Sequence, residues 1–89
     1  MVHMKISDLL ESPCVKILSF LHEGGEVRFY ELTDLISSRG TLSDNLGDLE
    51  EEGLIRRRIV ESKPIKSFYS LSEKGDEVAK HLSKVKDSF

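Results

Sequence analysis

The amino-acid sequence predicts a mostly helical α+β domain with a three-helix core, a two-stranded hairpin and a C-terminal helix. Four segments repeat apolar residues at helical spacing, and the segment before the last of them alternates with a period of two. With 89 residues, of which 38% are hydrophobic and 33% charged, the chain has the size and composition of one folded domain, residues 1–89. We expect Met1 to Met4 to be disordered or to be an artificial extension ahead of a natural start at Met4.

The first helix is predicted to begin after Ser12, because Ser12 and Pro13 combine a favoured N-cap residue with proline at the first helical position. Gly24 and Gly25 end it. The residues that follow, 26–28, are long enough only for a short extended link or a strand stub. The apolar face of this helix consists of Cys14, Ile17, Leu18 and Leu21.

Two further helices, joined by a tight turn, are predicted between Phe29 and Gly53. Ser38 is the expected N-cap of the third helix, which Gly53 stops. The apolar face of the second helix consists of Phe29, Leu32, Leu35 and Ile36, and that of the third of Leu42, Leu46 and Leu49. The outer face of the third helix carries short residues, namely Thr41, Ser43, Asp44, Asn45, Gly47 and Asp48.

From Leu54 the apolar pattern changes to an alternation with a period of two, as strand geometry requires. Residues 61–64 interrupt this strand and residues 67–71 resume it, which predicts a hairpin. Ser72 is the expected N-cap of the last helix. The two faces of the first strand are Ile55, Arg57 and Ile59 on one side and Arg56, Arg58 and Val60 on the other; the last helix has a narrow stripe of Val78, Leu82 and Val85, with Ala79 beside it.

The formal net charge of −3 argues at first against a nucleic-acid partner, because a protein needs positive charge where it meets phosphate. The distribution of charge points the other way. Between Leu54 and Lys66 the chain carries a local charge of +4, with Glu61 opposed by Arg56, Arg57, Arg58, Lys63 and Lys66. The chain is therefore acidic overall, with one basic segment on the predicted hairpin.

A pair of helices with a tight turn, followed at once by a basic hairpin, is typical of a winged helix-turn-helix fold, in which the hairpin is the wing. The second helix of such a pair enters the major groove, so it needs an apolar inner face and short polar outer residues near its start. Asn45 suits a bidentate contact with adenine, and Asp44 suits cytosine. We expect double-stranded DNA to be contacted by Ser38, Arg39, Thr41, Ser43, Asp44 and Asn45, and by Arg56, Arg57, Arg58, Lys63 and Lys66 on the wing.

Each of these features also has a purely structural interpretation. An amphipathic leucine helix is nearly always a core helix, and a run of arginines can be the solvated face of a strand. It is the combination of the helix pair, the tight turn and the basic hairpin that favours DNA as the partner.

The sequence resembles the winged-helix transcriptional regulators of the HxlR type over roughly Cys14 to Leu82, with motifs that fit without a gap from Ser38 to Gly75. It has a looser likeness to the MarR and ArsR families. The residues that carry the resemblance are 28–32; Leu42, Ser43, Leu46, Leu49, Glu50 and 53–55; and Arg57, Arg58, Pro64, Lys66, 69–72 and Gly75. It implies a homodimer that reads a near-palindromic site, with the third helix in the groove and the wing on flanking phosphates. The sequence departs from the family where the outer face of the third helix carries Asp44, Gly47 and Asp48 instead of a basic residue or two.

Cys14 is the only cysteine, which excludes an internal disulfide and a four-cysteine zinc site. The HxlR pattern often has Cys-Pro ahead of the first helix as a redox or electrophile sensor, whereas here Pro13 precedes Cys14. Because Cys14 falls on an apolar stripe, we expect a buried structural cysteine. The three histidines are too scattered for metal ligation, so no metal and no cofactor are expected.

Catalytic and membrane functions are not expected. The sequence contains no nucleophile turn, no glycine-rich phosphate loop and no carboxylate pair with a credible pocket, so we predict that it is not an enzyme. It also has no run of about 18 apolar residues and no secretory signal pattern, which predicts a cytoplasmic location and no membrane partner.

Two hypotheses of function remain open. The first is a sequence-specific DNA-binding transcriptional regulator acting as a homodimer, whose two recognition helices would lie about 34 Å apart. The expected dimer seam consists of Ile6, Leu9, Leu10, Val78, Leu82 and Val85, although these residues could equally pack within one subunit. The second is a winged-helix module for protein contact, as an adaptor or a subunit of a larger complex, whose acidic third helix docks a basic partner.

Overall fold

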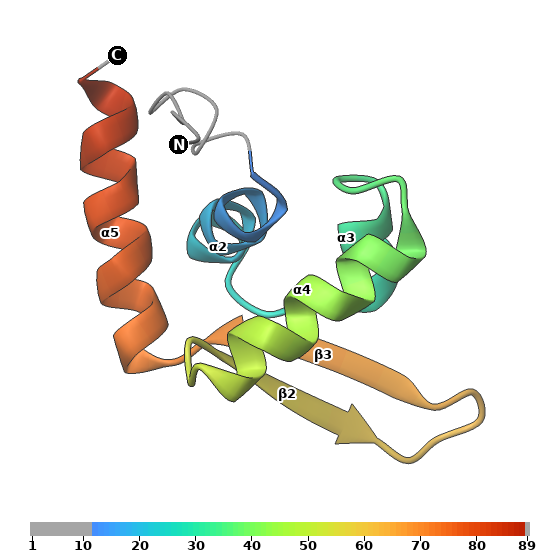
Figure 1. Ribbon diagram of the computed structural model, residues 1–89. Coiled ribbons are helices and arrows are strands. Elements are labelled where there is room, and N and C mark those ends of the chain that lie inside the picture. Colours follow the sequence, from blue (N-terminus) through green and yellow to red (C-terminus); the bar gives the residue numbers. More distant parts are fainter. Residues whose placement is uncertain (1–11, 89) are drawn as a thin grey trace.

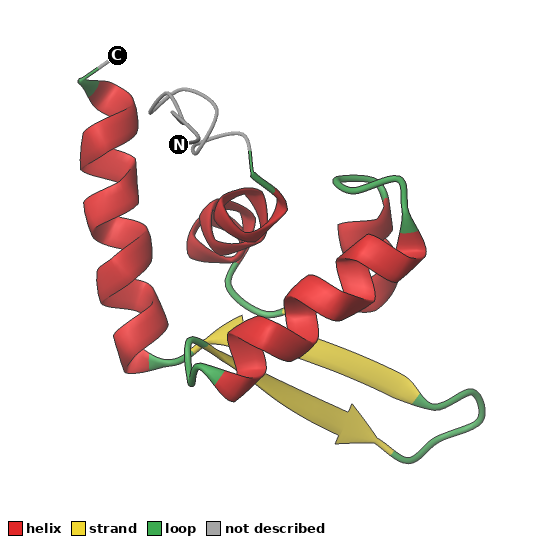
Figure 2. Ribbon diagram, in the orientation of Figure 1, coloured by secondary structure: helices red, strands yellow, loops and turns green. Residues whose placement is uncertain are grey.

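A computed structural model of the chain describes residues 12–88 and has the predicted winged helix-turn-helix architecture, mostly helical α+β (Figures 1 and 2). In chain order its elements are α2 (Pro13–Gly24), β1 (Val27–Arg28), α3 (Phe29–Thr33), α4 (Arg39–Glu51), β2 (Ile55–Val60), β3 (Lys66–Leu71) and α5 (Glu73–Asp87). The β2–β3 hairpin extends beyond the helices as the wing, and α4 lies across the sheet (Figure 1).

The wing belongs to a three-stranded antiparallel sheet in the order β1-β3-β2. Tyr69 in the central strand pairs with Val27 on one side and with Arg57 on the other. The stub expected at residues 26–28 is therefore a true strand. Because directly paired residues share one face of a sheet, the buried side chains of Val27, Ile55 and Tyr69 identify the face that packs under the helices.

The hydrophobic core lies between that sheet face and the helices. Ile17, Leu32 and Leu42 are fully buried, and the ring of Phe29 lies 6.4 Å from the ring of Tyr69. Leu35, Val78 and Leu82 are partly buried against the core. The further buried members of the cluster are Leu18, Leu21, Val27, Ile36, Leu46, Leu49, Ile55 and Ala79.

The three predicted serine N-caps are confirmed. The hydroxyl oxygens of Ser12, Ser38 and Ser72 accept hydrogen bonds from the backbone N–H groups of Val15, Thr41 and Gly75, respectively. Each bond satisfies one of the four N–H groups that the first turn of a helix leaves without an intrahelical partner. The positions at which α2, α4 and α5 begin thus follow directly from the sequence.

The second helix is shorter than its apolar pattern indicated. α3 ends at Thr33, and the N–H groups of Leu35 and Ile36 both point back to the carbonyl of Leu32 in a closing turn. Ile36 is nevertheless buried and Leu35 half-buried. The apolar spacing therefore predicts correctly which residues are buried, but it extends beyond the last residue of the helix.

Candidate nucleic-acid interface

The outer face of α4 is exposed and carries short polar side chains at its N-terminal end. Arg39, Thr41, Ser43 and Asp44 are all exposed, whereas Leu42 and Leu46 on the opposite face are buried. Gly47 on the same outer face has open space around it, since a Cβ there would meet nothing within 4 Å. The arrangement leaves a smooth, polar helix surface with the dimensions that a major groove admits.

The side chain of Asn45 points into the protein. Its amide nitrogen donates to the backbone carbonyl of Thr41 over 2.7 Å, and its Oδ1 accepts from the thiol of Cys14 on α2, also over 2.7 Å. Both ends of the amide are therefore engaged within the chain. A bidentate adenine contact by Asn45, as expected from the sequence, requires both of these bonds to open.

Cys14 is half-buried at this contact between α2 and α4. Burial raises the pKa of its thiol, and the carboxylate of Asp48 raises the pKa further. The thiolate is the reactive form of cysteine, so this environment favours the inert thiol.

The three wing arginines do not share one face. Arg57 lies on the sheet face that α4 covers, and its Nε is 3.6 Å from Oε1 of Glu50 at the end of α4. Arg56 and Arg58 alternate to the opposite, outer face of the sheet. Of the three wing arginines, only Arg57 thus lies between α4 and the wing.

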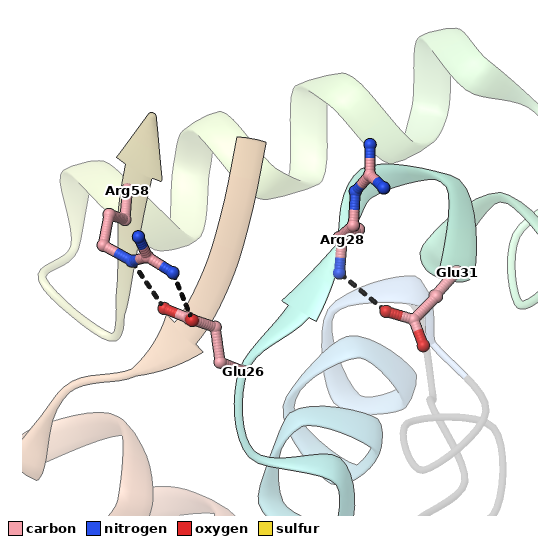
Figure 3. A network of polar contacts seen from close by, with 4 residues as sticks. All are labelled: Glu26, Arg28, Glu31 and Arg58. Atoms are coloured by element: carbon pink, nitrogen blue, oxygen red, sulfur yellow. Dashed lines mark hydrogen bonds and ion pairs between the residues drawn. The ribbon is translucent and has the colours of Figure 1, made fainter. Parts of the chain in front are cut away.

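Arg58 is bound on the outer face by Glu26, which precedes β1 (Figure 3). Its Nη2 and Nε donate to the two carboxylate oxygens over 2.7 and 3.1 Å. The guanidinium also lies 4.5 Å from the centre of the Phe68 ring. These hydrogen bonds hold the pKa of the Glu26 carboxyl below its usual value.

The two wing lysines carry charge near the end of the hairpin. Lys63 is exposed in the turn between the strands, and Lys66 is half-buried at the start of β3. Within residues 12–88 neither lysine is within 4.0 Å of a carboxylate. Their charges are therefore available to an anionic partner.

Arg28 is a cation of this region that the sequence pattern did not indicate as a site residue. Arg28 pairs directly with Phe68, which in turn pairs with Arg58, so the three side chains form a row across the outer sheet face. A strand of two residues is too short to show a pattern that would assign its basic residue to one face of the sheet. Its neighbour on β3 is 40 positions away in sequence, and only the strand register brings the two together.

The residues expected at a dimer seam have different environments. Val78 and Leu82 are partly buried against the core of their own subunit, whereas the side chain of Val85 is 39% exposed. Ile6, Leu9 and Leu10 lie outside the described residues, as do Met1 to Met4. In the described part of the chain the stripe on α5 is therefore used mainly for intramolecular packing.

Metal ligation and membrane insertion find no support in residues 12–88. No group of three or more His, Cys, Asp or Glu side chains in this range could hold a metal ion. Its helices are too short or too polar to cross a bilayer.

Comparison with known proteins places nearly all of the described region in one family. The family profile described as HxlR-like helix-turn-helix matches residues 14–88. YvaP of Bacillus subtilis, an uncharacterized HTH-type transcriptional regulator, is 31% identical over 83 residues, which are 91% of this chain and 77% of YvaP.

Solved structures of regulators share the fold. The transcriptional regulator ytfH from Salmonella typhimurium superposes with a TM-score of 0.76 at 26% identity, covering 92% of this chain and 78% of that one. Diamide-treated YodB from B. subtilis gives a TM-score of 0.71 at 25% identity, and the match covers 96% of this chain and 92% of YodB. A MarR-family regulator from Silicibacter pomeroyi is also similar, with a TM-score of 0.77 at 28% identity, covering 94% and 57%.

Proposed function

The chain belongs to the HxlR-like helix-turn-helix family of transcriptional regulators, and from this premise we propose that it binds specific sites in double-stranded DNA, with α4 in the major groove and the wing on the flanking backbone. The observation that carries the proposal is the exposed polar face of α4 beside a projecting basic hairpin. Membership of a regulator family also confirms the expectation that the chain is not an enzyme.

Base contacts are assigned to the outer residues of the first turns of α4. Thr41 and Ser43 have exposed hydroxyl groups that can donate or accept, and Asp44 can accept from the amino group of cytosine. Asn45 is a weaker candidate, since its amide already bonds to Cys14 and Thr41. This face is acidic, so affinity has to come from elsewhere.

Phosphate contacts are assigned to the wing and its surroundings. Arg57 lies on the same side of the sheet as α4, while Lys63 and Lys66 lie toward the end of the hairpin. The ion pair of Arg57 with Glu50 joins two partly exposed side chains and is weak for that reason. Exchanging the carboxylate for a phosphate therefore costs little. Arg39, exposed at the start of α4, can hold a phosphate or a guanine.

The proposal includes a homodimer, because reading two half-sites about 34 Å apart needs two recognition helices. Val78 and Leu82 pack partly against the core of their own subunit. Val85 is therefore the apolar residue of α5 that is most accessible to a second subunit. A seam on this helix would place the wings at the outer ends of the dimer.

A second candidate function is favoured by the exposed carboxylates of α4. Asp44, Asp48 and Glu51 are exposed along this helix, so a basic protein could dock where DNA is proposed to bind. In that function the polar helix face, and not the wing, carries the contact.

Fluorescence anisotropy with a labelled random-sequence duplex tests the choice. A DNA-binding regulator binds any duplex weakly through its phosphates, and the affinity falls steeply as salt rises from about 50 to 200 mM. We expect such binding for the wild-type chain. Absence of binding at the lower salt concentration would favour the protein-contact function.

A further inference from the structure

The guanidinium of Arg28 is held between two aromatic rings at the end of β1. Its Cζ lies 5.1 Å from the centre of the Tyr30 ring and 5.9 Å from that of Phe68. Both distances are within the range of cation–π attraction. The side chain of a long, flexible residue is thus kept in one place.

This guanidinium has no acidic partner in the described part of the chain. The salt bridges within residues 12–88 join Arg57 to Glu50, Arg58 to Glu26 and His22 to Asp76. Glu31, three residues on, accepts a hydrogen bond of 2.8 Å from the backbone N–H of Arg28 and not from its side chain (Figure 3). The N–H donors of the Arg28 guanidinium are therefore not committed to a carboxylate, in contrast to those of Arg58.

A groove opens beside Arg28 toward the wing. It is lined by Arg28, Phe29, Tyr30, Ile65 and Ser67 and has a volume of about 310 Å³. A single water molecule needs only roughly 10–15 Å³ of such space, so the groove has volume enough for an oxyanion of several atoms. The groove exists because β1 ends at its pairing with Phe68, whereas β3 continues to Lys66 and leaves its edge open.

We propose that Arg28 forms a phosphate-binding site in this groove, at the open edge of β3, and holds a phosphodiester of the DNA backbone there. The proposal rests on the proposed function and adds a contact to it. Arginine is suited to the role because its planar fork matches two phosphate oxygens at once. Since the rings already fix the guanidinium, less conformational entropy is lost when the anion binds.

The surroundings favour a phosphate backbone over other anions. Lys63 and Lys66 lie on the hairpin that supplies Ile65 and Ser67 to the groove, so cationic residues flank these lining residues in the sequence. Stacking of an unpaired base on Phe68 is disfavoured, because Arg58 and Arg28 already lie over that ring. The competing occupant of this groove is an acidic protein segment. If that is the true ligand, Arg28→Gln should leave the affinity for DNA unchanged.

The test compares Arg28→Gln with the matched charge change Lys80→Gln on α5, which is exposed and distant from the groove in sequence. Anisotropy with a random-sequence duplex is followed through a salt titration for both variants. We expect Arg28→Gln to weaken binding about tenfold at low salt and to reduce the slope of log K against log salt by about one phosphate. Lys80→Gln should leave both quantities at the wild-type values.

Two further variants separate a binding role from a structural one. Arg28→Lys keeps the charge but loses the planar fork, so it should retain the salt slope and lose part of the affinity. Tyr30→Leu removes one of the two rings at a side chain that is 60% exposed, which spares the fold, and should also lower the affinity. Melting temperatures of all variants are measured alongside, and Tyr30→Leu provides the test if Arg28→Gln does not fold.

The failure of this inference is distinct from failure of the proposed function. If the wild type binds DNA while Arg28→Gln behaves like Lys80→Gln, the phosphate site is wrong and the DNA-binding function stands. If the wild type does not bind duplex DNA at low salt, the proposed function and the site both fall.

Discussion

The thiol of Cys14 on α2 donates a hydrogen bond to Oδ1 of Asn45 on α4, over 2.7 Å. The same amide donates to the carbonyl of Thr41 one turn earlier in α4. Asn45 therefore links two helices from a position that the sequence alone presents as an outer, base-reading residue.

Reaction of Cys14 with a thiol reagent should be slow in the folded protein. Burial and the carboxylate of Asp48 both raise the pKa of the thiol, so the reactive thiolate is a minor species at neutral pH. Labelling rates in buffer and in denaturant measure the effect, and the unfolded chain should react much faster. Asp48→Asn removes the second cause and should lower the pKa and accelerate labelling. Equal rates in the folded and unfolded chains would contradict this account.

Gly75 in the first turn of α5 should not tolerate a side chain. A Cβ on Gly75 would clash with the backbone carbonyl of Leu54 and approach Cδ2 of Leu71 to 3.2 Å. Because a backbone atom cannot move aside cheaply, we expect Gly75→Ala to destabilise the fold by roughly 1–3 kcal/mol or more. Thermal unfolding measures this, with each kcal/mol worth roughly 4–8 °C in a domain of this size.

Gly47→Ala is the matched control, since a Cβ there meets nothing within 4 Å. Alanine is about 1 kcal/mol more favourable than glycine inside a helix, so this variant should melt at the same temperature as the wild type or higher. Similar decreases in melting temperature for the two variants would show that the close packing of α5 on Leu54 does not cause the instability of Gly75→Ala.

The Glu26 carboxyl should titrate at a lower pH than an unpaired glutamate. Its folded-state pKa is depressed by the hydrogen bonds from Arg58, so the pair contributes stability above the unfolded pKa and loses it as pH falls through the folded pKa. The contribution is small and sensitive to salt because the pair is exposed. An NMR titration of the Glu26 side chain should show the shift, and Arg58→Gln should abolish it. A titration unaffected by that change would refute the pairing.

Much of the fold could be predicted from local sequence signals. Ser12, Ser38 and Ser72 mark helix starts because each cap bonds to a backbone N–H three residues away. Strand alternation placed Arg57 on a different face from Arg56 and Arg58, as observed. The end of α3 was the exception, because the apolar spacing continues through Leu35 and Ile36 into the turn.

The site was less predictable, because its polar partners come from distant positions. Glu26 binds Arg58 across 32 residues, and Cys14 bonds Asn45 across 31. Neither contact leaves a periodic trace in the sequence. Which wing arginine faces α4, and which outer residue of α4 turns inward, depend on strand register and helix packing.

Val85→Glu should dissociate the proposed homodimer and leave the subunit folded. The side chain is 39% exposed, so a charge there costs the monomer little, whereas a charge in a dimer seam lacks a partner. Sedimentation at micromolar concentration should give twice 10.1 kDa for the wild type and 10.1 kDa for the variant. A wild type that sediments as a monomer would rule out the dimer under these conditions.

The most direct test of the central claim is duplex-DNA binding after charge reversal on the wing. Lys63→Glu combined with Lys66→Glu is compared with Lys16→Glu combined with Lys80→Glu, which changes the net charge equally at exposed sites on α2 and α5. Anisotropy at about 50 and 200 mM salt should show that the wing variant loses binding and that the control keeps the salt-dependent affinity of the wild type. Equal affinities for the two double variants would contradict a phosphate-binding wing.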